Sequence, residues 1–261
     1  MAQALKVFLC GHNPKCRTAA GRGRARLWLF AANVDRVVVP ARFPWQLVIF
    51  DNDGVVVDSE PLAALAQSRA LTSMGYPVTP QECDLAYKGI SLSDTRRLVE
   101  KSMGRPLPED FEQVYTANLA ELMATDLRPV PGVEKVLDYL EAEGAPYCLA
   151  SSSRRKQVGF GLATVGLADR FAGRWWGAED VAEAKPAPDL FLLAARSFEV
   201  PPAGCVVIED SAPGVAAARA AGMAVLGYAA RATGGELAEA DATFTDMAGL
   251  PAVLRAGPAT R

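Results

Sequence analysis

Short apolar runs recur along the chain, separated by longer stretches with the spacing of amphipathic helices. Runs of continuous apolar character predict strands at 46–51, 146–150, 205–208 and 224–227, with shorter candidates near 174–176 and at 243–244. Such runs are typical of strands buried on both faces, as in a parallel sheet. Helices are expected at about 132–143, from 153 to about 165, at 188–198 and at 211–221. This alternation predicts an α/β fold with helices on both faces of a parallel sheet.

One block of the chain interrupts the alternation. Between 61 and 128 no strand is predicted, whereas helices are expected at about 60–75, 79–87, 92–103 and 109–125. The block follows Gly54 and ends before Pro129-Val130-Pro131-Gly132, whose prolines and glycine are typical of a linker. We therefore predict a core made of residues 45–60 and 129–255, with an inserted helical cap of residues 61–128.

The first 44 residues differ in composition from the rest. They contain eight basic residues and one acid, a net charge of +7, whereas the remainder has 19 basic and 29 acidic residues, a net charge of −10. An Arg-rich, acid-poor leader is typical of targeting peptides, but the apolar run at 27–32 is too short and interrupted for a signal peptide. We interpret residues 1–44 as a disordered extension, or as translated sequence upstream of the true start, with local strand structure at Val37-Val38-Val39.

The cysteine and histidine content limits which kinds of catalytic and metal site the chain can form. The five cysteines are odd in number and scattered, which fits free thiols in a reducing compartment, so a cytoplasmic location is expected. The one histidine, His12, lies in the leader, which excludes a Ser-His-Asp triad or a multi-histidine metal site from the main body. No apolar run approaches the length of a membrane span. We expect no nucleic-acid partner, because a basic leader is usually only solvated. We also expect no membrane partner, and a monomer or weak dimer.

Reactive side chains follow several predicted strands. They are Asp51 and Asp53 after the first strand, Ser151 after the second, Glu209 and Asp210 after the last long one, and Lys185 in a proline-rich loop. The carboxyl ends of parallel strands share one rim, where we expect these groups to converge. Oxygen ligands of this kind suit magnesium. Each residue also has a commoner structural role: Asp53-Gly54 as a turn, Ser153 or Glu209-Asp210 as helix caps, and Lys185 as a solvated side chain.

Four segments in order resemble the motifs of the haloacid dehalogenase superfamily. They are Asp51-Asn52-Asp53-Gly54-Val55, Ser151 after Cys148-Leu149-Ala150, Lys185 in Lys-Pro-Ala-Pro-Asp, and Glu209-Asp210-Ser211-Ala212-Pro213-Gly214. The resemblance covers about 46–250, and the inserted helices are similar to the cap of the β-phosphoglucomutase-like subfamily. It implies a Rossmann-like core sheet with an α-helical cap.

The resemblance also implies residue roles in phosphoryl transfer. Asp51 would be the nucleophile that forms an aspartyl-phosphate, and Asp53 the general acid and base. Mg²⁺ would bind Asp51, the backbone carbonyl of Asp53, and Asp210, with Glu209 direct or through water. Ser151 would hold phosphate oxygens. Lys185 would neutralise charge and keep Asp51 ionised.

Two departures from the family pattern concern the first motif and the cap. Asn52 stands where an apolar residue is commoner. Lys88-Gly89-Ile90-Ser91 resembles the cap loop that faces the active site, so Lys88, Gly89 and Ser91 are candidate substrate contacts. Where β-phosphoglucomutase has an arginine that grips the distal phosphate, this chain has Leu92, and Arg96 or Arg97 could substitute.

These observations favour a magnesium-dependent phosphatase of a small phosphorylated metabolite, with a sugar phosphate as the expected substrate. A β-phosphoglucomutase-type phosphotransferase is the nearest alternative, and isomer formation instead of phosphate release would identify it. A metal-free dehalogenase would not need Asp53 or the other acids of the rim. A non-catalytic binding protein on the same fold is the remaining alternative, because fold does not fix function.

Overall fold

The computed structural model describes residues 43–232 and 234–257. The strand expected at residues 37–39, and the interpretation of residues 1–42 as disordered or as upstream sequence, lie outside the described residues. Within the described ranges, no helix combines the length and the apolar character needed to cross a membrane.

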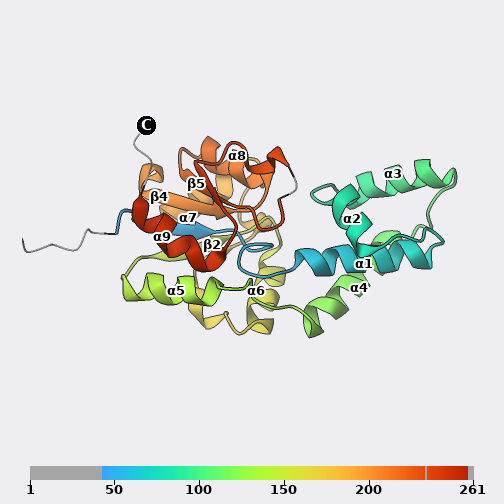
Figure 1. Ribbon diagram of the computed structural model, residues 1–261, viewed down its shortest axis with the longest axis horizontal. Coiled ribbons are helices and arrows are strands. Elements are labelled where there is room, and N and C mark those ends of the chain that lie inside the picture. Colours follow the sequence, from blue (N-terminus) through green and yellow to red (C-terminus); the bar gives the residue numbers. More distant parts are fainter. Residues whose placement is uncertain (1–42, 233, 258–261) are drawn as a thin grey trace, which may run out of the picture. The chain divides into compact units, whose positions relative to one another are not determined.

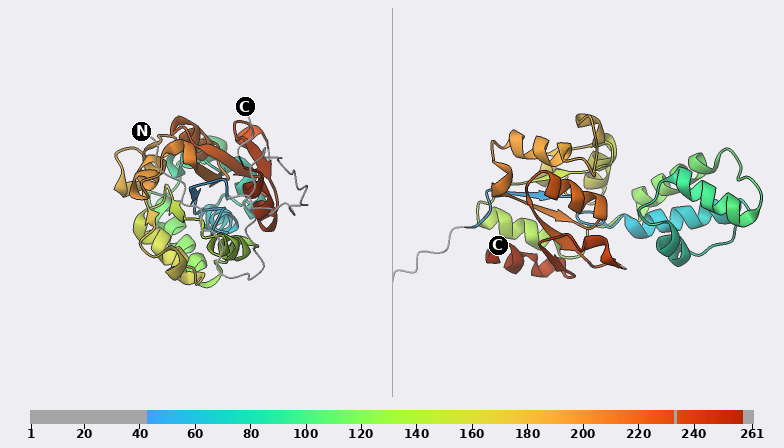
Figure 2. Two further views of the ribbon diagram at one scale, coloured as in Figure 1. Left: turned by 90° about the vertical axis from the view of Figure 1, so that its left-hand side faces the viewer. Right: turned by 90° about the horizontal axis from the view of Figure 1, so that it is seen from above.

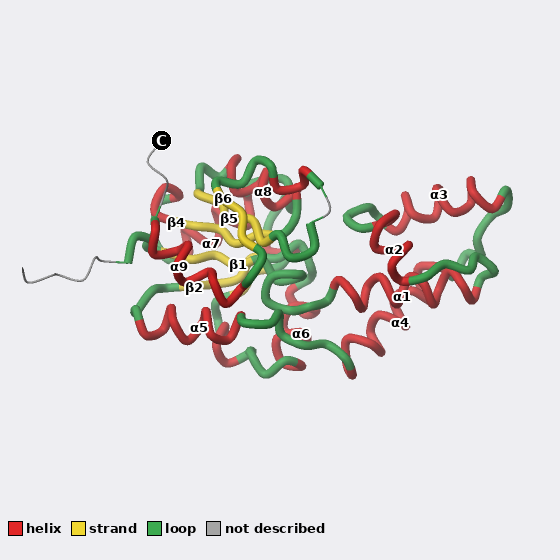
Figure 3. The backbone as a smooth tube through the Cα atoms, viewed as in Figure 1, coloured by secondary structure: helices red, strands yellow, loops and turns green. Residues whose placement is uncertain are grey.

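Six parallel strands form one sheet, drawn in yellow in Figure 3. Its order is β3-β2-β1-β4-β5-β6. The strands are β1 (Leu47–Phe50), β2 (Tyr147–Ala150), β3 (Trp175–Trp176), β4 (Cys205–Glu209), β5 (Ala224–Tyr228) and β6 (Ala242–Phe244). Because β1 pairs with both β2 and β4, the residues that follow these three strands emerge side by side. The predicted α/β fold with a parallel sheet is confirmed.

Helices cover both faces of the sheet because side chains alternate along each strand. Val48 and Phe50 of β1 belong to an apolar cluster with residues of α5 (Val133–Ala142), α6 (Arg155–Thr164) and α9 (Leu250–Ala256). Leu47 and Ile49 belong to a second cluster with α7 (Asp189–Ser197) and α8 (Ala212–Ala220). In the right-hand view of Figure 2, α5 (green) and α9 (dark red) lie together on one side of the strands. The sequence pattern did not predict α9.

Four helices lie between β1 and α5 in the chain (Figure 1). They are α1 (Glu60–Ser73), α2 (Pro80–Tyr87), α3 (Leu92–Met103) and α4 (Phe111–Thr125). They share an apolar cluster of their own, which includes Leu71, Cys83, Val99 and Phe111. A capping box between Thr79 and Glu82 begins α2, because each of the two residues satisfies a free N–H of the other. The proposed boundaries of a core and a cap remain predictions.

Candidate active site

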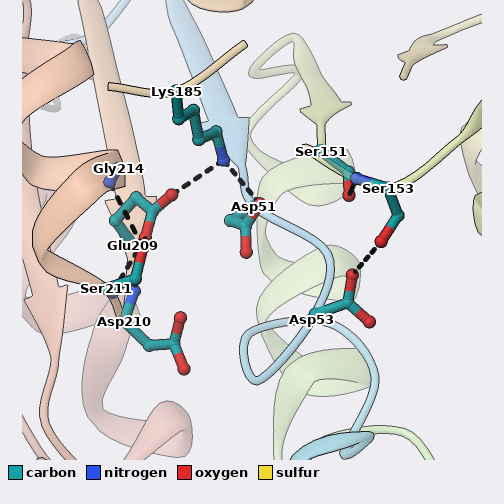
Figure 4. Close-up of polar contacts among 9 residues, drawn as sticks. All are labelled: Asp51, Asp53, Ser151, Ser153, Lys185, Glu209, Asp210, Ser211 and Gly214. Atoms are coloured by element: carbon teal, nitrogen blue, oxygen red, sulfur yellow. Dashed lines mark hydrogen bonds and ion pairs between the residues drawn. The ribbon is translucent and has the colours of Figure 1, made fainter. Parts of the chain in front are cut away.

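The ends of β1, β2 and β4 bring three polar side chains together at one edge of the sheet. Asp51 follows β1, Ser151 follows β2, and Glu209 is the last residue of β4. All three are buried. Buried polar groups of this kind need partners, because an unpaired one costs about 1–3 kcal/mol. Figure 4 shows that these partners come from several separate segments.

Lys185 lies between two of these carboxylates. Its Nζ donates to Asp51 Oδ1 at 2.5 Å and to Glu209 Oε1 at 2.7 Å, and its side chain is 4% exposed. Burial alone would lower the pKa of Lys185, but the charges of Asp51 and Glu209 outweigh it and raise the pKa. The ammonium therefore stays protonated. The alternative interpretation of Lys185 as a solvated side chain is wrong.

Glu209 is fully engaged by protein donors. Its Oε2 accepts hydrogen bonds from the backbone N–H of Asp210, the backbone N–H of Ser211 and the Ser211 hydroxyl, each at 2.9 Å. Its Oε1 accepts from Lys185. Ser211, not Glu209 or Asp210, is the residue whose side chain caps α8, through the backbone N–H of Gly214. Glu209 thus fixes both Lys185 and the first turn of α8.

Three carboxylates form a group whose composition fits a divalent cation. Asp51, Glu209 and Asp210 each offer an oxygen atom, and these atoms lie within 4.8 Å of one another. Burial raises the pKa of Asp51 to about 7; Lys185 opposes this shift, while Glu209 and Asp53 add to it. Burial, with Asp51 and Glu209, raises the pKa of Asp210 to about 8. The raised pKa values indicate that the protein supplies too little positive charge to neutralise these crowded carboxylates, and a bound cation would supply it. A set of oxygen ligands alone suits Mg²⁺.

Gly54 leaves room for the Asp210 carboxylate in this group. A Cβ added at Gly54 would lie 2.1 Å from Asp210 Oδ2, and the residue has a φ of +76°, which side chains rarely adopt. Glycine is therefore required here both for the turn and for the approach of Asp210.

The Asp53 carboxylate points away from this group (Figure 4). Its Oδ1 accepts a hydrogen bond from Ser59 Oγ at 2.8 Å, and its Oδ2 accepts one from Ser153 Oγ at 2.9 Å. The side chain of Asp53 is thus not part of the carboxylate group, and only its backbone carbonyl stays a candidate metal ligand. Two hydroxyl donors hold the carboxylate at the rim, where a general acid and base would be needed.

Two of the serines after β2, Ser151 and Ser153, have hydrogen-bond partners that the sequence did not indicate. The Ser151 hydroxyl accepts a hydrogen bond from the backbone N–H of Ser153 at 3.0 Å. The prediction that Ser153 caps the next helix is wrong, because Arg154 is the N-cap residue of α6 and the Ser153 side chain contacts Asp53. Sequence reasoning missed Ser59 and Ser153 as partners of Asp53. The only sequence feature that could have indicated these partners is that each is a hydroxyl residue close to one of the first two motifs.

Asn52 is 3% exposed, and its Oδ1 has no hydrogen-bond partner among the described residues. Its backbone carbonyl accepts from Val56 N at 2.8 Å and from Val57 N at 3.0 Å, which closes the turn after β1. Backbone geometry therefore explains the position of Asn52, and nothing in the structure explains why its side chain is polar.

The cap loop brings only one of its three candidate residues to the rim. Lys88 lines a small cavity with Gly54, Asp210, Tyr228, Arg231 and Ala232. Its Nζ lies 4.0 Å from Glu60 Oε2 and donates to the Arg231 carbonyl at 3.4 Å. Gly89 has a φ of +74° and open space around it. The Ser91 hydroxyl is engaged within α3, where it accepts from Asp94 N and donates to the Asp94 carboxylate.

Both arginines suggested as substitutes at Leu92 have partners within the four helices and the segments that join them. Arg96 donates to the carbonyls of Leu107 and Pro108 and lies over the Phe111 ring. These contacts hold Arg96 to the segment that precedes α4. Arg97 pairs with Asp94 on the exposed surface of α3.

Comparisons with known proteins agree with the motifs. A family model described as haloacid dehalogenase-like hydrolase matches residues 45–222. A protein of Drosophila melanogaster named "Probable pseudouridine-5'-phosphatase" is 35% identical over 184 residues, 68% of this chain and 79% of that protein. The 6-phosphogluconate phosphatase of Escherichia coli is 26% identical over 213 residues, 81% of this chain and 95% of that enzyme. A crystal structure of a conserved haloacid dehalogenase-like protein from Agrobacterium tumefaciens superposes with a TM-score of 0.74 at 34% identity, covering 81% of this chain and 98% of that one.

Proposed function

The chain belongs to the haloacid dehalogenase-like hydrolases, and from this membership we propose that it is a Mg²⁺-dependent phosphatase of a small phosphorylated metabolite. The observation that carries the proposal is the position of Lys185, whose Nζ lies 2.5 Å from Asp51 Oδ1, while Asp51 forms a group with two further acids, Glu209 and Asp210. A buried ammonium beside a nucleophilic carboxylate serves phosphoryl transfer, in which charge must be cancelled on the transferred group.

In the first step, an oxygen of the Asp51 carboxylate attacks phosphorus, and the bond from phosphorus to the ester oxygen breaks. Asp53 gives its proton to the leaving oxygen, so that an alcohol departs and an aspartyl-phosphate remains on Asp51. The hydroxyls of Ser59 and Ser153 support this role, because they hold the Asp53 carboxylate at the rim.

In the second step, water attacks the phosphorus of the aspartyl-phosphate. Asp53, now ionised, takes a proton from this water, the bond from phosphorus to the Asp51 oxygen breaks, and inorganic phosphate leaves. Lys185 keeps its proton throughout, because Asp51 and Glu209 raise its pKa. It therefore supplies a fixed positive charge in both steps, and Ser151 is proposed to hold a phosphate oxygen.

Magnesium would be held by Asp51, Asp210 and the backbone carbonyl of Asp53. When bound, it would neutralise charge on the phosphoryl oxygens and on the crowded carboxylates. The raised pKa values of Asp51 and Asp210 support its place here, since these acids lack sufficient positive charge from the protein alone. Glu209 is proposed to act by fixing Lys185 and the Asp210 backbone, because both of its oxygens already accept protein hydrogen bonds.

The proposed substrate is a sugar phosphate. The name of the Escherichia coli relative is that of a phosphatase acting on a phosphorylated sugar acid, and the Drosophila relative is named for a nucleoside phosphate that contains ribose. Residues 61–128 are proposed as a cap over a core of residues 45–60 and 129–255, with Lys88 facing the leaving group from the cap loop.

A panel of phosphorylated metabolites assayed for inorganic phosphate release with Mg²⁺ tests this proposal. We expect turnover of at least one sugar phosphate, loss of that turnover on chelation, and none with Asp51→Asn. Formation of an isomer from a hexose 1-phosphate without phosphate release would instead identify a mutase. No release from any member of the panel would overturn the proposed function.

A further inference from the structure

The loop after β5 reaches the same rim as the candidate nucleophile. β5 pairs with β4, so the residues that follow β5 emerge beside Asp210. Tyr228, the last residue of β5, lines the small cavity with Lys88 and Asp210, as do Arg231 and Ala232 of the loop that follows. Arg231 belongs to none of the four motifs, and no role in the proposed reaction requires it.

The Arg231 side chain contacts the chain where it leaves the sheet for α1. Its Nη2 lies 3.2 Å from Asp58 Oδ1 and 3.4 Å from Asp58 Oδ2. Asp58 also donates its backbone N–H to the carbonyl of Arg128, at 2.9 Å. Asp58 therefore joins the segment that enters the four helices to the segment that returns from them. Through this residue, Arg231 contacts the point where both connections meet.

The Arg231 backbone contacts the cap loop. Its carbonyl accepts a hydrogen bond from Lys88 Nζ at 3.4 Å, and the same ammonium lies 4.0 Å from Glu60 Oε2. Both contacts are long, so the position of Lys88 is sensitive to small shifts of the loop that carries Arg231. A lysine ammonium has three donors and flexible rotamers, so fixing it needs partners of fixed position.

We propose that Arg231 is a positioning residue for Lys88. Its ion pair with Asp58 fixes the loop after β5 to the base of the four helices, and its carbonyl in turn holds the Lys88 ammonium at the rim beside Asp210. This inference rests on the proposed function for its kinetic consequence, but its structural consequence does not depend on any activity.

The first test uses hydrogen–deuterium exchange of the full chain with Mg²⁺ and no substrate. The reporter is the amide of Ile90, which donates to the Tyr87 carbonyl at 3.3 Å in the cap loop. We expect Arg231→Gln and Asp58→Asn each to speed exchange of the peptide that contains residues 87–91, by about two- to five-fold, as an exposed ion pair allows. The double variant should equal the single ones, because both remove the same contact.

Matched variants separate this effect from a general loss of stability. Arg231→Lys should restore most of the protection, because it keeps the charge. Arg155→Gln is the control, since Arg155 is 42% exposed against 43% for Arg231 and also pairs with an acid, Asp180, but lies on α6. Unchanged exchange of residues 87–91 in Arg231→Gln, additive effects in the double variant, or equal acceleration by Arg155→Gln would overturn the proposal.

The kinetic test compares 6-phosphogluconate with p-nitrophenyl phosphate, which is too small to need the cap loop. We expect kcat/KM for 6-phosphogluconate to fall about two- to five-fold more in Arg231→Gln than kcat/KM for p-nitrophenyl phosphate. An equal fall for both compounds would place Arg231 in the chemical step and overturn its assignment as a positioning residue. If the wild type hydrolyses neither ester nor any other phosphate ester, the proposed function fails, and the exchange experiment still decides the role of Arg231.

Discussion

Ser153 Oγ lies 2.9 Å from Asp53 Oδ2, although the two residues are 100 positions apart in the chain. The contact joins the turn after β1 to the loop after β2, the neighbouring strand. It fixes one oxygen of the proposed general acid while Ser59 fixes the other. The geometry of the acid thus depends on two hydroxyl groups outside the first motif.

Removing the Ser153 hydroxyl should slow the reaction without unfolding the protein. One hydrogen bond contributes about 1 kcal/mol, so Ser153→Ala should lower kcat for p-nitrophenyl phosphate by about five-fold. Ser153→Thr should keep most of the activity. The exposed neighbour Ser152 provides the control, because its alanine variant changes the same loop but not the Asp53 contact. Equal losses in both alanine variants would contradict this role.

Asp51→Asn should abolish turnover and leave the fold intact. The amide keeps the shape of the side chain but is not a nucleophile, so we expect a loss of kcat on the order of 10⁴-fold or more. Circular dichroism and thermal melting should match the wild type closely, because Lys185 retains its contact with Glu209. Near-normal hydrolysis by the folded variant would rule out Asp51 as the nucleophile.

Magnesium binding should strengthen as the pH rises. In the metal-free protein, burial raises the pKa of Asp51 to about 7 and that of Asp210 to about 8. Below these values the carboxyl groups hold protons that the cation must displace; above them the groups are already ionised. The apparent Kd should therefore fall by on the order of ten-fold or more between pH 6 and pH 8.5. Isothermal titration calorimetry at matched ionic strength measures it, and a Kd independent of pH would contradict the assignment.

Replacing Lys185 should damage stability as well as chemistry. Lys185→Met leaves Asp51 and Glu209 buried without their cation, and breaking a buried pair in this way costs about 3–5 kcal/mol. Denaturant unfolding measures the change in free energy, with Lys156→Met on the exposed surface of α6 as the control. Mg²⁺ should recover part of the loss, because it would neutralise Asp51, one of the two carboxylates that lose the ammonium. Wild-type stability in Lys185→Met would show that the pair contributes little.

Lys88→Ala should discriminate between substrates. Lys88 lines the cavity beside Asp210 but contacts none of Asp51, Asp53 or Lys185. We expect a higher KM, or a lower kcat/KM, for a sugar phosphate, and little change for p-nitrophenyl phosphate. Steady-state kinetics with both esters measures the difference between the two effects on kcat/KM. Equal losses on the two would place Lys88 in the chemical step, and no loss on either would remove the cap loop from the substrate site.

The fold could be predicted from the sequence because apolar run length separates its strands from its helices. The runs at 46–51 and 205–208 correspond to β1 and β4, within one or two residues at each end. The missed helix α9 has seven residues, a proline near its start and no long amphipathic pattern, so little in its sequence distinguishes it from a loop. Its packing against the sheet, through Leu250 and Leu254, is what identifies it.

The candidate site, too, could be predicted from the sequence only in part. Asp51, Lys185, Glu209 and Asp210 could be named beforehand because each stands in a motif at a predicted strand end or loop. The contacts of Ser59, Ser153 and Arg231 depend on which strands are neighbours and on side-chain rotamers, which no local pattern encodes. Ser91 could be named from the sequence both as a substrate contact and, with Ser93, as a candidate cap of the helix at 92–103, and the structure shows that Ser91 caps α3.

Gly214 is a helical position at which a common thermostabilising substitution should fail. Exchanging a helical glycine for alanine is a common stabilising substitution, with a gain of about 1 kcal/mol. At Gly214 the new methyl group would lie 1.7 Å from Glu209 Oε1, the same oxygen that accepts from Lys185. A consensus or helix-propensity redesign that ignored this atom would improve α8 in isolation and displace the carboxylate that holds Lys185. Directed evolution for heat resistance should therefore find stabilising alanines elsewhere in the helices and leave residue 214 unchanged.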